Sequence, residues 1–582
     1  MVNEEIARLF ERMARVLAFK GRDRFRIMAY ERAAVSIRDL EEDVASIAAA
    51  GQLEEIPGVG KDLSKMIEEY IRKGVMSRYE RECRGIPQEL IDLMSIPGLG
   101  PRTLALLHQK AQVNDFESLK RCLDSESLVK LHGFGARRIE NIKRGIELWN
   151  SSRHRMLIGV AYPLAENLLG QIRQNELVDR AEAAGSLRRC REDIGDLDIL
   201  ITSRNGPKAL RQLTKLPIVR RILETGETKA AVIIEGGVHV DIRAVDASAF
   251  GAAMQYFTGS KQHNIHLRRI AHERGLKCNE YGLFRGDRRI GGENEDDIYG
   301  ALGMRTMPPE LREARGEIEA AIADKLPKLV NLVDLCGDLH THTTWSDGRS
   351  TVEEMVNHAE ELGYEYIALT DHSPSERVAH GLDRARLEKK IEEIERLRAT
   401  RKKRPPHILI GAEVDILDGG KLDYPEDILA RLDVVVGGLH SGFKQSRSHC
   451  TGRLLDAIAN PALDILAHPT SRLIGSREPL EFDFNVIVRA AVGAGVALEI
   501  NGSMYRLDLN DVMAKAAQEA GALLAIGSDA HSTAQMDQIR YGVFQARRGW
   551  VEARSVLNTW PWPDLSKWLD RTHVARVLEK AV

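Results

Sequence analysis

Hydrophobic positions follow three different patterns along the chain, and each pattern predicts a different kind of structure. Up to about residue 150 they recur at helical spacing, and the first predicted helix has one apolar face. This face consists of Ile6, Leu9, Phe10, Met13, Val16 and Leu17. From about residue 155, short β-branched runs at 197–202 and 231–235 alternate with helical stretches, which indicates an α/β or α+β domain. A highly charged helical stretch, 310–324, follows and is interpreted as a connector.

The third pattern begins near residue 335 and extends to about 570. Short apolar strands alternate with longer helices, which predicts a parallel sheet of about seven strands. The predicted strands are 335–339, 365–369, 407–412, 433–439, 463–467, 496–500 and 522–527. Nearly every one ends in a residue type that binds metals, and in (β/α) barrels the chemistry gathers at the carboxyl ends of the strands.

The composition limits the class of protein. The 582 residues have room for about three to five domains. The six scattered cysteines include no C-x-x-C pair and fit a reducing cytosol better than a disulfide framework or a thiolate zinc site. No apolar run approaches the roughly 18 residues that span a bilayer. A cytoplasmic protein without membrane contact is therefore expected.

The net charge of −3 alone argues against a strongly basic nucleic-acid binder, but it is an average over two unlike parts. Residues 1–330 hold 53 Lys and Arg against 49 Asp and Glu, whereas residues 331–582 hold 30 against 37. The first part is mildly basic, and the acid excess of the second includes groups that metals would neutralise. The balance therefore leaves room for a nucleic-acid binder whose phosphate contacts are local, at turns and helix N-termini.

Histidines and carboxylates cluster at the predicted strand ends of the third region. Eleven of the 18 histidines lie after residue 335. The candidate ligands are His340, His342, Asp347, His372, Glu413, His440, His468, Asp529 and His531. Imidazole with carboxylate suits zinc, manganese or iron better than magnesium alone, and nine ligands imply two or three ions. Any one of these histidines could instead be a hydrogen-bonded core residue, but that reading does not account for the joint pattern.

A pair of aspartates marks a second candidate site. Asp196 and Asp198 lie two residues apart on a predicted strand and therefore face the same side, and Asp241 lies on a second strand. Three such carboxylates could hold two Mg²⁺ ions, and the upstream turn at Gly185, with Ser186 and Arg189, is suited to a triphosphate. This equipment fits in-line nucleotidyl transfer. The alternative is a surface hairpin with acidic side chains.

Three Gly-x-Gly turns in the helical region each precede a helical stretch with Lys or Arg. The glycines are Gly58 and Gly60, Gly98 and Gly100, and Gly133 and Gly135. Glycine lets the backbone approach a ligand closely, and a helix N-terminus attracts phosphate. A single turn of this kind usually just joins two helices, whereas three of them resemble helix-hairpin-helix motifs that bind DNA.

The strand-end motifs resemble those of the PHP domain, which is shared by bacterial polymerases and histidinol phosphatases. They are the H-x-H at 340–342 with Asp347, Thr-Asp-His at 370–372, Gly-Ala-Glu at 411–413, Ala-His-Pro at 467–469 and Ser-Asp-Ala-His at 528–531. The resemblance covers about 335–570 and implies a trinuclear metal site in a distorted seven-stranded barrel. It does not make Asp338, Glu499 or Asn501 ligands.

The Gly-Ser turn and the G-D-x-D at 195–198 resemble the nucleotidyltransferase signature, in particular that of the family X DNA polymerases. Tyr-Phe-Thr-Gly-Ser at 256–260 and Gly-Glu-Thr-Lys at 226–229 strengthen the match. The resemblance implies nucleotide binding by Gly185, Ser186, Arg189, Gly195, Tyr256, Phe257, Gly259, Ser260 and Asn264. It implies DNA contacts at Thr228, Lys229, Arg243 and Arg268. Lys261 departs from relatives with an acidic residue there, which puts contacts to the nucleotide base in question.

The first Gly-x-Gly turn and its surroundings resemble the small lyase domain of this polymerase family. The lysine that would form a Schiff base there falls at Met66, and neither Lys61 nor Lys65 matches cleanly. Binding of a 5′-phosphate is therefore the expected role, rather than lyase activity.

Together the resemblances imply a multidomain α/β protein of the bacterial family X type. The predicted domains are a helical DNA-end-binding domain (1–80), a second helix-hairpin-helix domain (81–150), an α+β palm (151–248), a thumb (249–315), a linker (316–334) and a distorted (β/α)7 PHP barrel (335–575).

The predicted function is a gap-filling, monomeric DNA repair polymerase with a 3′–5′ exonuclease, with abasic-site endonuclease activity as an additional alternative. It would use dNTPs, gapped or primed DNA with 5′-phosphate ends, Mg²⁺ at the palm, and two or three Zn²⁺ or Mn²⁺ ions at the PHP site. The alternatives are a PHP phosphomonoesterase, which would act on 3′-phosphates or a small molecule, and a DNA-binding scaffold with weak polymerase activity that delivers the nuclease.

Overall fold

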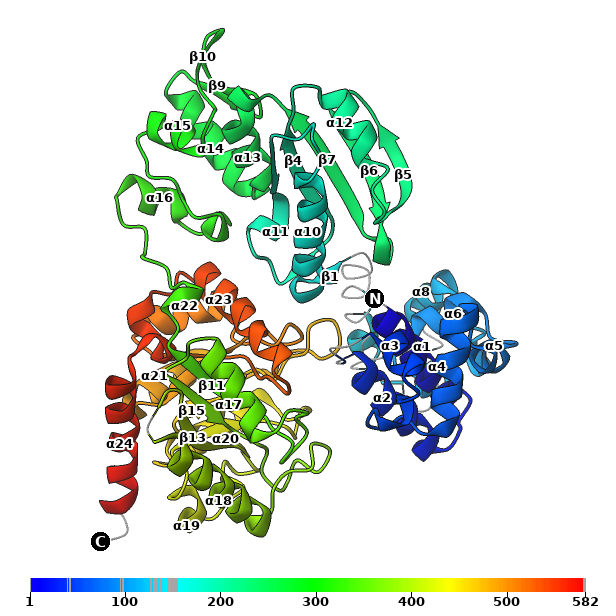
Figure 1. Cartoon of the computed structure of the whole chain (residues 1–582), viewed down its shortest axis with the longest axis vertical. Helices are drawn as coiled ribbons and strands as arrows, with labels where there is room; N and C mark the ends of the chain where they lie inside the picture. The colour runs from blue at the N-terminus through cyan, green and yellow to red at the C-terminus, as the bar shows by residue number, and fades with distance from the viewer. Residues whose placement is uncertain are drawn as a thin grey trace. The chain divides into compact units, whose positions relative to one another are not determined.

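The computed structural model describes residues 2–38, 40, 43–94, 96, 99–125, 128, 134–135, 138–143, 146, 155–402 and 404–578 (Figure 1). Their contacts divide the chain into two compact units, one formed by residues 1–154 with 475–477 and the other by the remainder. None of the helices in these ranges combines the length and apolar character needed to cross a membrane.

The first unit is helical. Its helices are α1 (Val2–Phe19), α2 (Arg24–Arg38), α3 (Val44–Ala49), α4 (Lys61–Lys73), α5 (Ser77–Cys83), α6 (Gln88–Leu93), α7 (Pro101–Ala111) and α8 (Phe116–Asp124). The apolar face predicted for the first helix is confirmed, since Ile6, Phe10 and Met13 are buried against α2 and α4 in one core. Val16, on the same helix, is buried in a second core with α6, α7 and α8.

A five-stranded sheet forms the palm. Its strand order is β2 (Arg180–Ala183), β4 (Leu197–Thr202), β7 (His239–Val245), β6 (Lys229–Ile234) and β5 (Val219–Thr225). Only β4 and β7 run parallel, and their register sets Asp198 directly beside Asp241. Alternate residues such as Leu197, Ile199 and Ile242 point into a core covered by α10 (Ile158–Arg173) and α12 (Gly206–Leu213).

The thumb follows the palm. It contains α13 (Phe250–Thr258), α14 (Lys261–Glu273), the sheet β8 (Lys277–Asn279), β9 (Gly282–Arg285) and β10 (Arg288–Gly291), α15 (Glu295–Ala301) and α16 (Glu317–Ile322).

The charged stretch that was predicted to be a connector belongs instead to this core. Ile318 and Ala321 pack within it, and buried Arg312 pairs with Glu295 at 2.5 Å. Glu317 accepts a hydrogen bond from His263 at 2.8 Å and is also buried. The prediction of a connector was wrong, because the density of charged residues alone did not reveal that the side chains of Arg312 and Glu317 are buried with partners.

The third region is a seven-stranded parallel barrel. The strands, in sheet order, are β11 (Gly337–Thr341), β12 (Tyr366–Leu369), β13 (His407–Asp415), β14 (Val434–Gly438), β15 (Ile465–Leu466), β16 (Ala497–Asn501) and β17 (Leu524–Gly527). A bridge between Thr341 and Ala530 nearly closes the ring. All seven predicted strands are confirmed, with ends shifted by up to three residues.

Alternate residues of these strands enter two different cores. Tyr366, Ala368 and Leu409 lie in one core with Leu565 and Trp568 of α24 (Trp562–Leu578). The other residues, such as Ile367, pack against the surrounding helices. These helices are α17 (Val352–Glu361), α18 (Arg384–Arg401), α19 (Glu426–Leu429), α20 (Arg447–Ile458), α21 (Phe484–Ala494), α22 (Asp511–Glu519) and α23 (Ile539–Arg548).

Palm and barrel also touch through an apolar cluster within the second unit. Ile158 and Cys190 of the palm are buried with Leu507 and Tyr541 of the barrel domain. At Gly159 the backbone lies so close to Met504 that a side chain there would overlap it.

Candidate functional site

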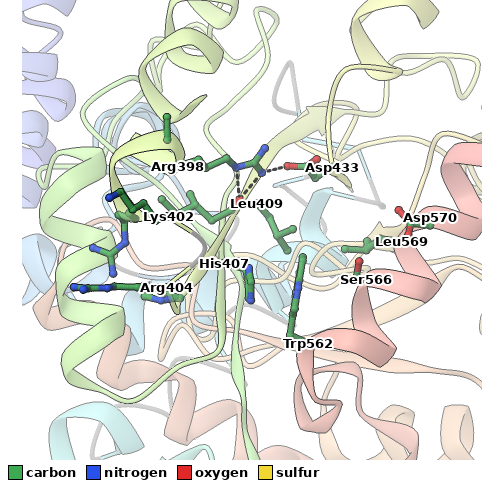
Figure 2. A pocket seen from close by; sticks show the side chains of 14 residues that line it. Arg398, Lys402, Arg404, His407, Leu409, Asp433, Trp562, Ser566, Leu569 and Asp570 are labelled. Carbon is green, nitrogen blue, oxygen red and sulfur yellow. Dashed lines mark hydrogen bonds and ion pairs between the residues drawn. The ribbon is translucent and has the colours of Figure 1, made fainter. Parts of the chain in front are cut away.

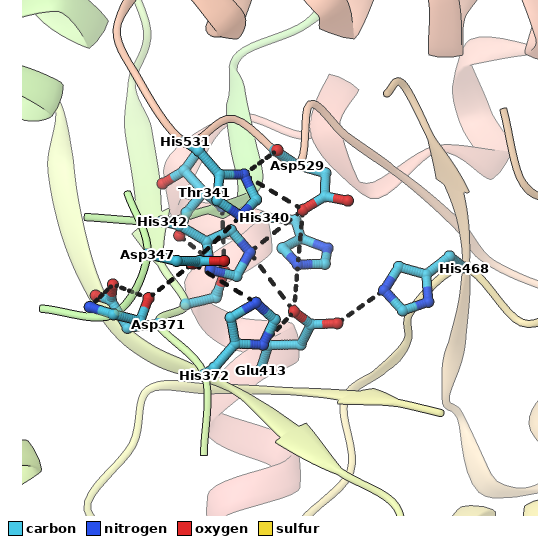
Figure 3. A network of polar contacts seen from close by, with 12 residues as sticks. His340, Thr341, His342, Asp347, Asp371, His372, Glu413, His468, Asp529 and His531 are labelled. Carbon is cyan, nitrogen blue, oxygen red and sulfur yellow. Dashed lines mark hydrogen bonds and ion pairs between the residues drawn. The ribbon is translucent and has the colours of Figure 1, made fainter. Parts of the chain in front are cut away.

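The nine predicted metal ligands meet at the carboxyl end of the barrel (Figure 3). Glu413, at the end of β13, lies in the middle. One of its oxygens lies 3.0 Å from His440 Nε2 and 2.8 Å from His468 Nε2. Its other oxygen lies 3.1 Å from His372 Nδ1 and 3.5 Å from His342 Nε2. The strand ends thus bring Glu413 together with histidines 27 to 71 positions away in the sequence, as the parallel topology predicts.

The ligand atoms form three overlapping groups, each compact enough for one ion. The groups are His342, Asp347, His372 and His531; His340, His342 and Asp529; and His372, Glu413 and His440. Mixed imidazole and carboxylate ligands suit transition metals such as zinc, manganese or iron. The geometry is therefore consistent with a centre of divalent metal ions.

Several ring nitrogens in this centre are buried and have no hydrogen-bond partner among the described residues. They include His340 Nε2 and both nitrogens of His342. Burying a polar atom without a partner is costly. A set of such atoms converging on one space fits metal ligation, which would use their lone pairs.

Two buried carboxylates outside the ligand set hold parts of the centre in place. Glu499 accepts a hydrogen bond from His340 Nδ1 at 2.7 Å and another from the backbone N–H of His468 at 2.7 Å. It thereby turns His340 Nε2 toward the cluster. Asp371 pairs with buried Lys390 at 2.8 Å and accepts from the Thr343 hydroxyl, which fixes the loop after His342. The sequence patterns had excluded Glu499 as a ligand but gave it no role.

Electrostatics in the centre favour ionised carboxylates. Burial opposes ionisation of Glu413, but His440 and His372 outweigh it and hold its pKa well below the usual value. Burial also acts to lower the pKa of His440, yet Glu413 and Asp415 raise it to about 10. For His372, burial prevails and lowers the pKa to about 4. A dense negative charge is thus available to cations, which would displace protons from the histidines.

The paired aspartates form the second site, in the palm. Asp198 and Asp241 are opposite each other on β4 and β7, whereas Asp196 precedes β4 and is exposed. Burial, followed by the charges of Asp196 and Asp241, raises the pKa of Asp198 to about 6. Asp196 and Asp241 thus lie close enough to Asp198 to act on it, as a shared cation site requires.

Gly185 makes room for Asp198. Its φ is +63°, and a side-chain carbon there would overlap Asp198 Oδ2. Residues other than glycine are strained in this left-handed region and would also displace the carboxylate. The predicted Gly-Ser turn thus starts the short helix α11 (Gly185–Arg188) directly against the carboxylates.

A cavity of 660 Å³ opens beside these carboxylates and brings together most of the predicted nucleotide-binding residues. Its lining includes Gly185, Ser186, Arg189, Gly195, Asp196, Asp198, Tyr256, Phe257, Gly259, Asn264 and Arg268. Lys261 also lines it, as do Arg155 and Arg191, which the sequence patterns had not indicated. Both arginines bind Asp193 in the structure, and Arg155 does so from 38 positions away, a contact that no local motif indicates.

Two of the predicted nucleotide-binding residues, Arg189 and Ser260, form hydrogen bonds with other parts of the protein. Arg189 donates to the carbonyl of Thr258 and, at 3.1 Å, to Glu313, so it ties the palm to the thumb. Arg548 of α23 donates to the Arg189 carbonyl at 2.7 Å and to Glu313 at 3.0 Å. The Ser260 hydroxyl lies outside the cavity lining and caps α14 by accepting from the His263 N–H at 3.3 Å. Protein contacts therefore already occupy part of the hydrogen-bonding capacity of Arg189 and Ser260.

The predicted DNA-contacting residues of the palm lie next to Asp241. Lys229 Nζ is 2.9 Å from Asp241 Oδ2, and Arg243 lies 3.7 Å from the same oxygen. The Arg243 guanidinium also stacks over Phe257. Thr228 is exposed in the turn before β6.

The Gly-x-Gly turns are partly described. Gly58 has a φ of +80° and packs against Arg32, and Gly60 is the N-cap of α4. Gly100 is the N-cap of α7, and Gly135 precedes a helical stretch at 138–143. Gly98 and Gly133 lie outside the described residues. The turns at Gly60 and Gly100 thus place free helix N-termini where the sequence predicted phosphate contacts.

The position expected for a lyase lysine faces the core. Met66 is buried on α4, where its sulfur accepts from the Tyr30 hydroxyl at 3.5 Å. Lys61 and Lys65 are exposed on the same helix.

Family models match four parts of the chain. They are a helix-hairpin-helix domain (1–76), a SAM-like helix-hairpin-helix tandem (90–147), a DNA polymerase beta thumb (253–313) and a PHP domain (338–502). One chain thus combines a thumb of the DNA polymerase beta type with a PHP domain.

A full-length relative specifies the family. The DNA polymerase/3′-5′ exonuclease PolX of Bacillus subtilis (strain 168) is 36% identical over 578 residues, which cover 98% of this chain and 100% of the relative. The chain therefore belongs to the bacterial PolX family of family X DNA polymerases with a C-terminal PHP domain, as the sequence motifs had implied. A probable phosphatase of Thermoanaerobacter sp. (strain X514) is 32% identical over 38% of this chain and 89% of its own length.

Proposed function

We propose that the palm site adds nucleotides to a primer 3′ end and that Asp196, Asp198 and Asp241 hold the Mg²⁺ ions for this reaction. The supporting observation is the side-by-side placement of Asp198 and Asp241 at a cavity of 660 Å³. The primer hydroxyl attacks the α-phosphate of a dNTP, and pyrophosphate leaves. Bound Mg²⁺ ions supply charge stabilisation for the entering and leaving oxygens.

The protein's own groups orient the nucleotide. Ser186 and the backbone of the turn at Gly185 face the phosphates, and Tyr256 and Phe257 face the sugar. Lys261 and Arg268 extend the positive lining of the cavity. Arg189 acts on the phosphates only with the part of its guanidinium that Thr258 and Glu313 leave available.

The PHP centre is the 3′–5′ exonuclease site in this proposal. Its nine ligands would hold two or three Zn²⁺ or Mn²⁺ ions, which lower the pKa of a bound water and neutralise phosphate charge. The charge pattern around Glu413 supports binding of cations at neutral pH. Glu499 and Asp371 position the ligands and take no part in the chemistry.

The helical region binds DNA through its Gly-x-Gly turns. We place the 5′-phosphate of a gap at the α4 N-terminus, because Gly60 leaves the N–H groups of that helix free of any side-chain cap. With Met66 buried, this unit binds the phosphate without lyase activity. The protein acts as a monomer on gapped or primed DNA and prefers such DNA to intact duplex.

Separate inactivation of each site on a primed, gapped DNA tests the assignment. Asp198→Ala abolishes extension and leaves mononucleotide release from a 3′-hydroxyl end unchanged. His342→Ala has the opposite effect. The matched controls are Asp287→Ala and His449→Ala, both at exposed positions outside the two sites. Extension by Asp198→Ala, or undiminished release by His342→Ala, refutes the corresponding site.

A phosphomonoesterase is the second candidate for the PHP centre, because a probable phosphatase matches this part of the chain. DNA with a 3′-phosphate and DNA with a 3′-hydroxyl distinguish the two. Faster release of phosphate than of mononucleotide, lost in His342→Ala, would favour the phosphatase.

Extension supported only by Mn²⁺ and not by Mg²⁺ would favour a scaffold with weak polymerase activity.

A further inference from the structure

A cavity of 590 Å³ lies at the opposite end of the barrel from the metal centre (Figure 2). Its walls come from the last turn of α18, the segment that leads into β13, and α24. Glu413 follows His407 by six residues on β13, so the strand places the cavity roughly 20 Å from the metal ligands. The cavity therefore belongs to neither of the two sites described above.

One wall of the cavity is basic. Its basic residues are Arg398, Arg401, Lys402 and Arg404, of which Lys402 and Arg404 are exposed. Neither has an acidic partner among the described residues. Arg398 and Arg401 are engaged instead, with Asp433 and Glu360 respectively, although Arg401 Nε is buried without an acceptor. The cavity thus has cationic groups available for an anion.

The opposite surface is aromatic and apolar. The rings of His407 and Trp562 stack with centroids 4.3 Å apart and an angle of 14° between their planes. Leu409 and Leu569 extend this surface, and Ser566 and Asp570 of α24 also line the cavity on this side. Figure 2 shows Lys402 and Arg404 along one side, Leu569 along the other, and the two rings between them.

We propose that this cavity binds a nucleotide, either free or at the end of a DNA strand, with its phosphate at Lys402 and Arg404 and its base against the aromatic surface. Basic groups with three or more donors bind phosphate oxygens by charge-assisted hydrogen bonds. Bases stack on aromatic rings without regard to sequence. The volume lies within the range of small-ligand pockets. The proposal requires no metal and does not depend on the assignment of either active site.

Binding of dAMP to the full-length, metal-loaded protein tests the proposal. The protein is titrated calorimetrically, and the wild type is compared with the double variant Lys402→Glu/Arg404→Glu. The wild type binds one more dAMP per chain than the variant, whose affinity at this site falls at least tenfold. The double variant Lys389→Glu/Arg396→Glu is the charge-matched control, because both residues are exposed on α18 outside the cavity. It binds dAMP like the wild type.

Further arms identify what the cavity recognises. Trp562→Leu weakens dAMP binding but not that of inorganic phosphate, since it removes only the stacking surface. A 5′-phosphorylated octathymidylate with phosphorothioate linkages at its 3′ end takes the place of dAMP in a parallel titration. If the Lys402→Glu/Arg404→Glu variant loses affinity for dAMP, free nucleotides are the ligand. If it loses affinity only for the oligonucleotide, strand ends are the ligand. Equal binding of both ligands by wild type and Lys402→Glu/Arg404→Glu overturns the proposal, as does phosphate binding as tight as that of dAMP.

Discussion

Replacing Gly185 with alanine tests whether Asp198 has to lie where the structure places it. The added carbon would overlap Asp198 Oδ2 and lie 3.2 Å from Cγ, whereas ordinary contacts begin at 3.4 Å. The carboxylate must therefore move by about 1 Å, which can reduce a rate on the order of 100-fold when it misplaces a reacting group. The left-handed φ of +63° adds roughly 1–2 kcal/mol of strain.

The assay is single-nucleotide extension of a primed template with Mg²⁺, run beside release of mononucleotides from a 3′-hydroxyl end. We expect kcat/KM for extension to fall about 100-fold, equivalent to about 2.7 kcal/mol, with nuclease activity unchanged. Gly170→Ala is the matched control, because Gly170 lies within α10 and an added carbon there meets nothing within 4 Å. That variant keeps full activity.

Extension by Gly185→Ala within threefold of the wild type would refute the reasoning. It would mean that the carboxylate tolerates displacement or that Asp198 does not hold the ion. A parallel loss of nuclease activity would instead indicate general misfolding, which the melting temperature of Gly170→Ala and Gly185→Ala would reveal.

Three further predictions concern charged groups in the two sites and the thumb. Since the pKa of Asp198 is raised to about 6, the Mg²⁺ concentration for half-maximal extension should be constant above pH 6 and rise about tenfold per unit below it; a flat profile from pH 5 to 7.5 would contradict this. Glu499→Gln removes the acceptor that orients His340 and should lower nuclease activity 10–100-fold without affecting extension; metal analysis then shows whether ions are lost. Glu295 is partly buried, which opposes ionisation, but Arg312 outweighs this and lowers its pKa to about 2. Glu295→Gln should therefore destabilise the thumb by about 3 kcal/mol in urea unfolding at pH 7, compared with exposed Glu293→Gln, and the gap should close as pH falls from 4.5 toward 2.

The strands of the barrel and the clustering of the candidate metal ligands were predictable from sequence because both depend on short-range patterns. A buried parallel strand is a run of apolar residues, and its carboxyl end is fixed by the same run, so Glu413 and His440 were located without any tertiary information. The parallel sheet then brings the ends together. The same reasoning located Asp196 and Asp198 one strand away from Asp241.

Contacts between distant segments were not predictable. Nothing near Glu317 in the sequence indicates that His263 will bind it, so the charged stretch that contains it was interpreted as a connector. Arg189 looks like a free phosphate ligand in its motif, yet its partner Glu313 lies 124 residues away. Likewise, only the folded barrel brings Glu499 to His340. Buried ion pairs of this kind leave no periodic trace in a sequence.

The apolar cluster between palm and barrel has a practical consequence for dissecting the protein. Ile158 and Cys190 are covered by Leu507 and Tyr541. A protein truncated after residue 330 would therefore expose this apolar surface on the palm. Such a fragment would aggregate or melt early, and its inactivity would say nothing about whether the nuclease domain helps in synthesis. Single substitutions that leave this apolar cluster intact are the appropriate way to assign functions to the polymerase part and the nuclease part of the chain.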